Sequence, residues 1–344
     1  AMRLPFPVLA IILHALVAAV THAQPLLGRV EQRSFIGPVT GRSVSFNIYL
    51  PEGYDTSTAR YPVVYHLHGI GGNQGGQQNT SVPRAFESAY AQGQIGRVII
   101  VFPNGYTDAF WSDSIGGDKP AETDLVLQLI PHVDALFRTI NAPGCRVIEG
   151  FSMGGFGATK TYARFPDLFA CCVEYDGAIV TWQTMLQSHP DLALSIFGND
   201  ETYFNQFSPR RWSTEHAPTL RGMPPVRMVV GALVGGNRQF RDHLLALNIP
   251  VDYSETTCSH SIDCLMTTSG VASAAFIASH LRLPCEPDRN RDGNVDQDDV
   301  EYVRNTVGGG DNPNGLDPDI NQDGSVDQDD IAAMIHIVAG GPCP

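Results

Sequence analysis

A serine between closely spaced glycines is the clearest candidate for chemistry in this chain. Gly150-Phe151-Ser152-Met153-Gly154 fits the pattern G-x-S-x-G, in which the glycines permit a sharp strand-to-helix turn that lifts the serine hydroxyl clear of the backbone. An apolar stretch over residues 145–149 precedes it, and a helical stretch rich in small residues follows over 154–162. The alternative is a Gly-Ser turn that only packs, but the context predicts that Ser152 is a nucleophile.

A glycine-rich loop offers backbone donors for the same chemistry. His68-Gly69-Ile70-Gly71-Gly72 follows an expected strand. We expect the backbone N–H of Ile70 to join that of Met153 in an oxyanion hole. Removal of one such donor typically costs about 2.7–4 kcal/mol in activation free energy. The alternative is a glycine loop that serves close packing alone.

The general base is expected late in the chain. Where the serine of a G-x-S-x-G turn is the nucleophile, the acid and then the histidine follow it in chain order. His260, in Thr257-Cys258-Ser259-His260, follows the last expected strand and precedes an expected helix. The other histidines lie beside the glycine-rich loop or within other patterns, so His260 is the predicted base.

Strands alternate with helices along the chain and must position these groups. The expected strands cover residues 43–50, 61–68, 97–102, 145–149, 171–175, 226–230 and 251–254. The expected helices cover residues 122–137, 154–162 and 237–247. This alternation predicts an α/β fold with a mostly parallel sheet covered on both faces. Residues 191–219 break the pattern and are expected to form an insertion over the carboxyl edge of the sheet, where a substrate would sit.

Residues 29–283 resemble the esterase D-like esterases. That group includes the feruloyl and acetylxylan esterases of carbohydrate esterase family 1, formylglutathione hydrolases and secreted depolymerases. The resemblance is carried by YHLHGIGG at 65–72, FWSDS at 110–114, EGFSMGGFGA at 149–158 and the Ser259-His260 loop. It implies an α/β-hydrolase fold and an esterase with a Ser-His-acid mechanism that needs no cofactor.

The catalytic acid is where the sequence departs from this family. The family places it three residues into the turn after the strand that here ends at Val230-Gly231, and Val234 stands at that position. Our candidate is Asp176, at the end of the strand beside the nucleophile strand, where some α/β-hydrolases carry the acid. Asp242, Asp263 and the absence of any acid remain as alternatives, and a strand-end capping role is the alternative for Asp176.

The last 60 residues differ in charge from the rest of the chain. Of the formal net charge of −14, residues 285–344 carry −11, with 14 acidic side chains and three arginines. Such an acidic block argues against a nucleic-acid partner. It contains two 12-residue loops that start 31 residues apart, at Asp288 and at Asp319.

Both loops place oxygen-bearing side chains at the positions that bind calcium in an EF-hand loop, with glycine at position 6 and aspartate at position 12. The predicted calcium ligands are Asp288, Asn290, Asp292, Asn294, Asp296 and Asp299 in the first loop, and Asp319, Asn321, Asp323, Ser325, Asp327 and Asp330 in the second. Each loop precedes an expected helix, at 300–307 and 331–338. The alternative is a solvated acidic linker.

The duplicated loop-helix pattern resembles a type I dockerin. The resemblance implies two bound Ca²⁺ ions, a small all-α domain and a cohesin-like protein partner or retention at the cell surface. The recognition pairs at loop positions 10 and 11 are Gln297-Asp298 and Gln328-Asp329. They differ from the Ser-Thr pair common in cellulosomal examples, which argues against a cellulosomal partner.

The amino-terminal residues and the cysteines favour export. Arg3, the apolar run 8–20 and a small residue at Ala23 predict a cleaved signal peptide over residues 1–23, rather than a membrane anchor. No later stretch suits a membrane span. We therefore expect an esterase domain over 24–284 and a dockerin domain over 285–344.

Seven cysteines fit an oxidising compartment. The expected disulfides join Cys258 to Cys264, Cys285 to Cys343, and Cys145 to Cys171 or Cys172, which leaves one thiol free. Buried thiols throughout are the alternative.

The leading hypothesis is a secreted carboxylesterase that acts on feruloyl or acetyl esters of plant polysaccharide. A polyhydroxybutyrate-type depolymerase or a general short-chain esterase is the second. A carbohydrate-binding protein that has lost catalysis, suggested by Val234, is the third.

Overall fold

The computed structural model describes residues 25–283, 286–314, 316, 318–321 and 325–341. The predicted signal peptide over 1–23 lies outside the described residues. Every described helix falls short of the length or apolar character that a bilayer crossing requires.

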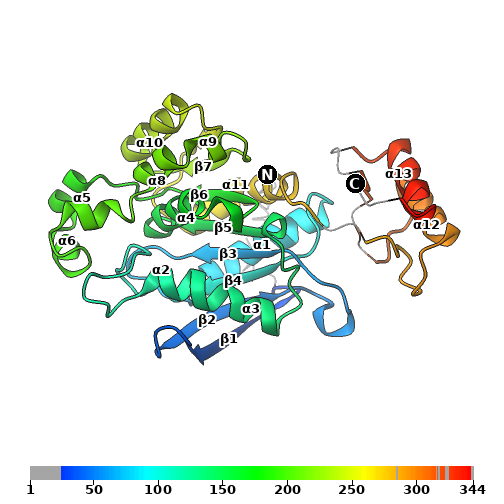
Figure 1. Ribbon diagram of the computed structural model, residues 1–344, viewed down its shortest axis with the longest axis horizontal. Helices are drawn as coiled ribbons and strands as arrows, with labels where there is room; N and C mark the ends of the chain where they lie inside the picture. Colours follow the sequence, from blue (N-terminus) through cyan, green and yellow to red (C-terminus); the bar gives the residue numbers. More distant parts are fainter. Residues whose placement is uncertain (1–24, 284–285, 315, 317, 322–324, 342–344) are drawn as a thin grey trace, which may run out of the picture.

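A single twisted sheet forms the centre of residues 25–283 (Figure 1). Its strands are β1 (Arg29–Ile36), β2 (Ser43–Leu50), β3 (Val63–Leu67), β4 (Ile99–Pro103), β5 (Arg146–Phe151), β6 (Cys171–Tyr175), β7 (Val226–Val230) and β8 (Val251–Glu255). Their order in the sheet is β1-β2-β4-β3-β5-β6-β7-β8. The six strands from β4 to β8 in this order are parallel, and β2 and β1 extend one edge of the sheet through antiparallel pairings.

The helices lie on both faces of this sheet. They are α1 (Gln78–Ala91), α2 (Ala121–Thr123), the π-helix η2 (Asp124–Leu129), α3 (Ile130–Leu136), α4 (Met153–Arg164), α5 (Trp182–Ser188), α6 (Pro190–Ser195), α7 (Glu201–Asn205), α8 (Pro209–Glu215), α9 (Ala217–Leu220), α10 (Val234–Ala246) and α11 (Ile262–Ala278). Short 3-10 turns are η1 (Tyr54–Thr56), η3 (Pro143–Cys145) and η4 (Pro166–Leu168).

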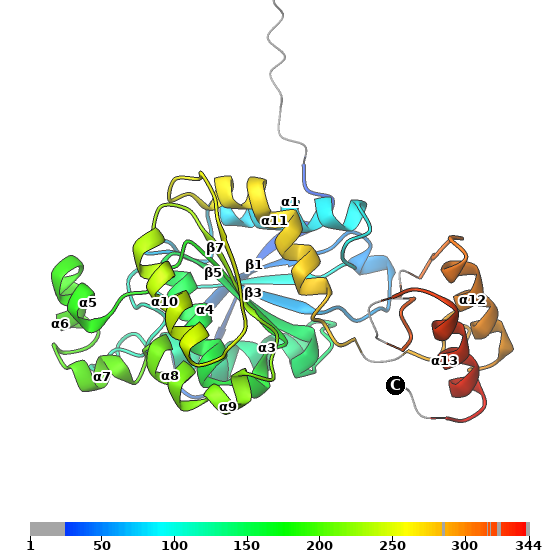
Figure 2. The same cartoon turned by 90° about the horizontal axis from the view of Figure 1, so that it is seen from above.

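The two faces of the sheet have separate hydrophobic clusters. Apolar residues of α1 and α11 pack on one face, and those of α3, α4 and α10 pack on the other (Figure 2). The central parallel strands β3 to β6 are buried along nearly their whole length, as expected for a sheet that is covered on both faces. The predicted α/β architecture is therefore confirmed, although the sequence analysis missed β1 and α1.

Two further helices, α12 (Gln297–Val307) and α13 (Gln328–Val338), belong to the acidic tail. They pack against each other through a small hydrophobic cluster that includes Val300, Val303, Ile331 and Met334. This cluster shares no residue with the clusters on the sheet. Both helices start three residues before the predicted starts at 300 and 331, because Asp296 and Asp327 form capping boxes with Asp299 and Asp330.

Candidate active site

Ser152 lies in a strained turn between β5 and α4. Its φ and ψ are 58° and −118°, a conformation that is unusual for a residue with a side chain. A Cβ at Gly150 would overlap the backbone of Gly154, and a Cβ at Gly154 would overlap that of Leu67. The two glycines therefore permit the close approach of strand, turn and helix that raises Ser152, as the G-x-S-x-G pattern predicts.

The carboxyl edge of the sheet brings His260 to Ser152. His260 Nε2 lies 2.8 Å from Ser152 Oγ, although the two residues are 108 positions apart. The loop that carries His260 follows β8, and the Phe151 ring lies 4.6 Å from the imidazole. The His260 side chain is 38% exposed and Ser152 is 4% exposed, so the pair lies at the surface edge of the core, where a substrate can reach it.

Asp176 completes this arrangement from the end of β6. Its Oδ2 lies 2.6 Å from His260 Nδ1, and the side chain is fully buried. Burial opposes ionisation, but the hydrogen bond with His260 and those from backbone amides outweigh it, so the pKa of Asp176 lies below its ordinary value. The carboxylate therefore stays charged and directs the Nδ1 proton of His260, which leaves Nε2 to accept a proton from the serine.

The turn after β7 supplies those amides rather than a carboxylate. The backbone N–H groups of Gly231, Ala232 and Leu233 donate to Asp176 at 2.9, 3.0 and 2.8 Å. Val234, at the position where the resembled family carries its acid, is the first residue of α10. The sequence offered no signal for this role of the turn, because backbone donors do not depend on residue type.

The alternative acids lie elsewhere. The exposed Asp242 accepts hydrogen bonds from its neighbour Arg241. Asp263 stands in the first turn of α11. Of the three candidate aspartates, Asp176 is the one that contacts the His260 ring.

Ile70 and Met153 are among the residues beside Ser152 whose backbone N–H groups have no protein acceptor in the described part of the chain. In the glycine-rich loop, Gly71 donates to Thr107 O and Gly72 donates to Gly69 O, whereas the amide of Ile70 makes no backbone hydrogen bond within the described residues. A Cβ at Gly69 would lie 3.1 Å from Ser152 Cβ, so this loop passes directly over the serine. Met153 is the first residue of α4, where helix amides lack intrahelical partners. The structure therefore places the loop that carries Ile70, and the first residue of α4, beside the same serine.

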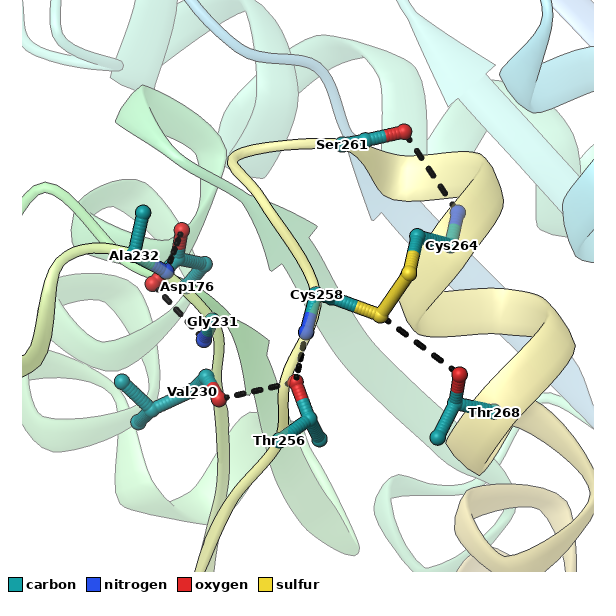
Figure 3. Close-up of a disulfide and its surroundings, with 9 residues drawn as sticks. All are labelled: Asp176, Val230, Gly231, Ala232, Thr256, Cys258, Ser261, Cys264 and Thr268. Atoms are coloured by element: carbon teal, nitrogen blue, oxygen red, sulfur yellow. Dashed lines mark hydrogen bonds between the residues drawn. A yellow bond between two sulfur atoms is a disulfide. The ribbon is translucent and has the colours of Figure 1, made fainter.

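The loop of His260 is closed by a disulfide between Cys258 and Cys264 (Figure 3). The predicted pairing is confirmed, with an S–S distance of 2.02 Å. Thr256 connects the loop to β7, because its N–H and Oγ1 both donate to Val230 O, at 2.8 and 3.1 Å. His260 is thus held between a covalent bridge and the strand end whose turn binds Asp176.

The predicted bond from Cys145 to Cys171 or Cys172 is wrong. All three are free and buried, and burial raises the pKa of the Cys145 thiol to about 11. Cys145 lies in η3, and its Sγ contacts Arg282 O at 3.0 Å. Cys171 and Cys172 are consecutive strand residues and point to opposite faces of the sheet. Three described thiols are therefore free rather than one, and the predicted Cys285–Cys343 bond lies outside the described residues.

The expected insertion over 191–219 belongs to a longer group of short helices between β6 and β7, α5 to α9, which starts at Trp182. It packs on the segment around residues 110–115. Ile115 N donates to Ile196 O at 2.8 Å, and Tyr203 OH donates to Asp113 O at 3.1 Å. The ring of His189 lies 5.7 Å from that of Phe110. Figure 2 shows α5, α6 and α7 together at one end of this region.

The tail loops are closed by hydrogen bonds to their own aspartates. Asp299 accepts from the amides of Asn290 and Asp296 at 3.0 and 2.9 Å. Asp330 accepts from those of Asn321 and Asp327 at 3.2 and 2.8 Å. Gly293, at position 6 of the first loop, has a φ of 94°, as the loop turn requires.

The donor types and this turn fit calcium. Across the described residues, however, no three carboxylate, imidazole or thiol side chains converge as a metal shell. The predicted ligand Asp323 lies outside the described residues.

Comparisons with known proteins agree with this geometry. Residues 37–205, just under half of the chain, match the family model Esterase, described as "Putative esterase". Esterase MT1326 of Mycobacterium tuberculosis (strain CDC 1551 / Oshkosh) is 34% identical over 142 residues, which are 40% of this chain and 30% of that protein. The endo-1,4-beta-xylanase/feruloyl esterase of Xylanibacter ruminicola is 34% identical over 154 residues, which are 41% of this chain and 20% of that protein. The chain thus spans less than a third of either relative.

A solved structure shares the fold. A ferulic acid esterase superposes with a TM-score of 0.63 at 18% identity, over 74% of this chain and 99% of its own. This likeness confirms the predicted α/β-hydrolase fold for the sheet domain.

Proposed function

We propose that this carboxylic ester hydrolase is a secreted serine esterase that releases feruloyl or acetyl groups from plant polysaccharide. The observation that carries the esterase mechanism is the continuous hydrogen-bonded line from Ser152 Oγ through His260 to Asp176, with distances of 2.8 and 2.6 Å. The printed name of the Xylanibacter ruminicola relative supports the feruloyl ester as substrate. The expected signal peptide supports secretion.

The mechanism follows from the positions of these groups. His260 removes the Ser152 proton as the serine oxygen attacks the ester carbonyl, and Asp176 stabilises the imidazolium that forms. The amides of Ile70 and Met153 hold the negatively charged oxygen. His260 then protonates the departing alcohol, which leaves an acyl-enzyme on Ser152. Water activated by His260 hydrolyses that ester, so the reaction needs no cofactor.

Active-site labelling tests this mechanism. We expect a fluorophosphonate probe to label the wild-type protein at Ser152 and 4-nitrophenyl acetate to be turned over. Ser152→Ala should lose both properties while the melting temperature stays within a few degrees. An absence of labelling and turnover in folded wild-type protein would instead support the binding-protein hypothesis. Asp176 weakens that hypothesis, because it supplies the carboxylate that Val234 does not.

A substrate panel tests the acyl group. Methyl ferulate, acetylated xylan and polyhydroxybutyrate separate the feruloyl, acetyl and depolymerase hypotheses. We expect kcat/KM on methyl ferulate or acetylated xylan to exceed that on the polyester. The opposite order would support the depolymerase.

We propose that the tail is a calcium-binding dockerin with a cohesin-like partner. Support comes from the two matching loops, each closed onto an aspartate at position 12 and followed by a capped helix. The oxygens of residues 288–299 and 319–330 would hold one Ca²⁺ in each loop. Calorimetry with Ca²⁺ on EDTA-treated protein should give binding heat and a more stable tail, and neither would occur in a plain acidic linker.

A further inference from the structure

A partly buried segment, residues 105–111, makes three hydrogen bonds to the glycine-rich loop that carries Ile70. Gly105 N donates to His68 Nε2 at 3.2 Å. The Trp111 indole N–H donates to His68 O at 3.1 Å. Thr107 O accepts from Gly71 N at 2.6 Å. These contacts fix the backbone on both sides of Ile70.

The same segment is attached to α4, which carries Met153. Phe110 N donates to Met153 Sδ at 3.3 Å. The buried ammonium of Lys160, in the third turn of α4, donates to Trp111 O at 2.6 Å. The indole lies so close to Gly157 that a Cβ there would overlap it. Segment 105–111 therefore connects the two elements that provide the amides beside Ser152.

The conformation of the segment is set by its surroundings. Phe110 and Trp111 have φ angles of 51° and 53°, which bulky side chains rarely adopt. Both residues are only 1% exposed. Such backbone conformations persist where the surrounding structure over-determines them, and they concentrate at functional sites.

The His68 ring makes these contacts as a neutral imidazole with its proton on Nδ1. Burial lowers its pKa to about 4, so the ring is neutral at ordinary pH. Nδ1 lies 2.8 Å from Gly69 O and carries the proton. Nε2 is then free to accept from Gly105 N, as the contact requires. The ring thus links the loop to the start of the segment in one tautomer.

We propose that Trp111 is a positioning residue for the oxyanion hole, which sets the separation of the Ile70 and Met153 amides by joining the glycine-rich loop to α4. This inference rests on the proposed esterase function. Transition-state stabilisation depends on preorganised donors, and a misplacement of about 1 Å can cost about 100-fold in rate. Trp111 touches no reacting atom and acts through His68 and the loop.

The substitution Trp111→Phe tests this role, because it removes the indole N–H and keeps an aromatic ring. We expect kcat on 4-nitrophenyl acetate to fall by about 10- to 100-fold, with KM within about twofold. Fluorophosphonate labelling should slow in parallel, since the phosphonyl oxygen uses the same donors. Trp212→Phe is the matched control. Its half-buried indole also donates to a backbone carbonyl, Gln206 O at 2.7 Å, and the variant should keep wild-type kcat.

A second variant separates the N–H from packing. Site-specific incorporation of 3-benzothienylalanine at position 111 keeps the bicyclic ring and lacks the donor, and it serves if the phenylalanine variant does not fold. Wild-type kcat in a folded variant of either kind overturns the proposal, as does an equal loss in Trp212→Phe or a loss confined to KM. Wild-type protein that neither hydrolyses the ester nor reacts with the probe would reject the esterase function itself.

Discussion

Two regions of the chain bury an aspartate that accepts backbone N–H groups, and they differ in where the donors come from. The donors to Asp176 lie 55 to 57 positions away, in the turn after β7. Those to Asp299 lie 3 and 9 positions away, and Asp330 repeats these two spacings. All three side chains are fully buried. The same kind of hydrogen bonding joins distant strands in the sheet domain and closes a single loop in the tail.

This difference has consequences for function. A carboxylate whose donors come from another strand fixes two segments relative to each other, and in the esterase domain a third segment, the His260 loop, contacts it as well. A carboxylate with local donors shapes only its own loop. Substitutions at the two kinds of site should therefore separate catalysis from tail folding.

The largest effect is expected for Asp176→Asn. Asparagine keeps a similar shape but loses the charge that orients His260, and comparable substitutions in serine hydrolases lower kcat by about 10⁴-fold. Steady-state kinetics on 4-nitrophenyl acetate measure it, and circular dichroism checks the fold. Asp242→Asn is the matched control, because that exposed side chain pairs with Arg241. Near-normal turnover of a folded Asp176→Asn enzyme would reject Asp176 as the acid.

Glu174 is a buried carboxyl with one backbone donor, whereas Asp176 has three, so the two show how the number of donors affects a buried carboxyl. It lies two residues before Asp176 and accepts from Gly177 N at 2.5 Å. Burial raises its pKa to about 8. The folded protein thus keeps a proton that the unfolded chain releases above its ordinary pKa near 4.5, so this group makes stability fall as pH rises from about 4.5 to about 8.

Glu174→Gln should remove this fall in stability with rising pH, because the glutamine amide is neutral. Its oxygen still accepts the hydrogen bond from Gly177 N. Near pH 8 we expect a gain of roughly 4 kcal/mol in unfolding free energy over wild type, with little difference near pH 4.5. Thermal melts across this range measure it, and Glu255→Gln at the surface is the control. If the difference in unfolding free energy between Glu174→Gln and wild type does not change with pH, the raised pKa of Glu174 is contradicted.

Asp299→Asn tests the buried aspartate whose backbone donors, Asn290 and Asp296, lie in its own loop. One carboxylate oxygen that accepts a backbone N–H would be replaced by an amide N–H₂, so a buried donor loses its acceptor at a cost of about 1–3 kcal/mol. We expect the tail to unfold at a lower temperature and kcat to remain unchanged. Hydrogen exchange of α12 measures the first effect. A fall in kcat on a small soluble ester would show that the two regions are coupled.

The smallest effect is expected for the double variant Cys258→Ser, Cys264→Ser. The His260 loop would keep its Thr256 contacts and lose the covalent bridge. Looser positioning of the base should lower kcat by about tenfold, with little change in KM. Cys145→Ser, which removes a buried free thiol, is the control. Unchanged kcat in the double variant would show that packing alone holds His260.

Features set by neighbouring residues were predictable from the sequence. The β5-Ser152-α4 turn depends on Gly150 and Gly154, whose absent side chains are visible in the sequence. The starts of β6 and β7 were predicted at the right residue. The tail helices follow loops whose repeat is visible at a spacing of 31 residues. Asp176 was the leading candidate for the acid, but the sequence left Asp242 and Asp263 open, because the choice depends on which side chain the folded sheet brings to His260.

By itself, the sequence determined the strand-turn-helix around Ser152, the position of His260 after the last strand and the two acidic loops, because each depends on residues close together in the chain. The tertiary structure alone decided that the turn after β7 gives amides to Asp176, that Cys145 bonds to neither Cys171 nor Cys172, and that segment 105–111 joins the glycine-rich loop to α4. These contacts join residues tens of positions apart, and backbone donors leave no trace in residue type. Only the order of strands in the sheet brings them together.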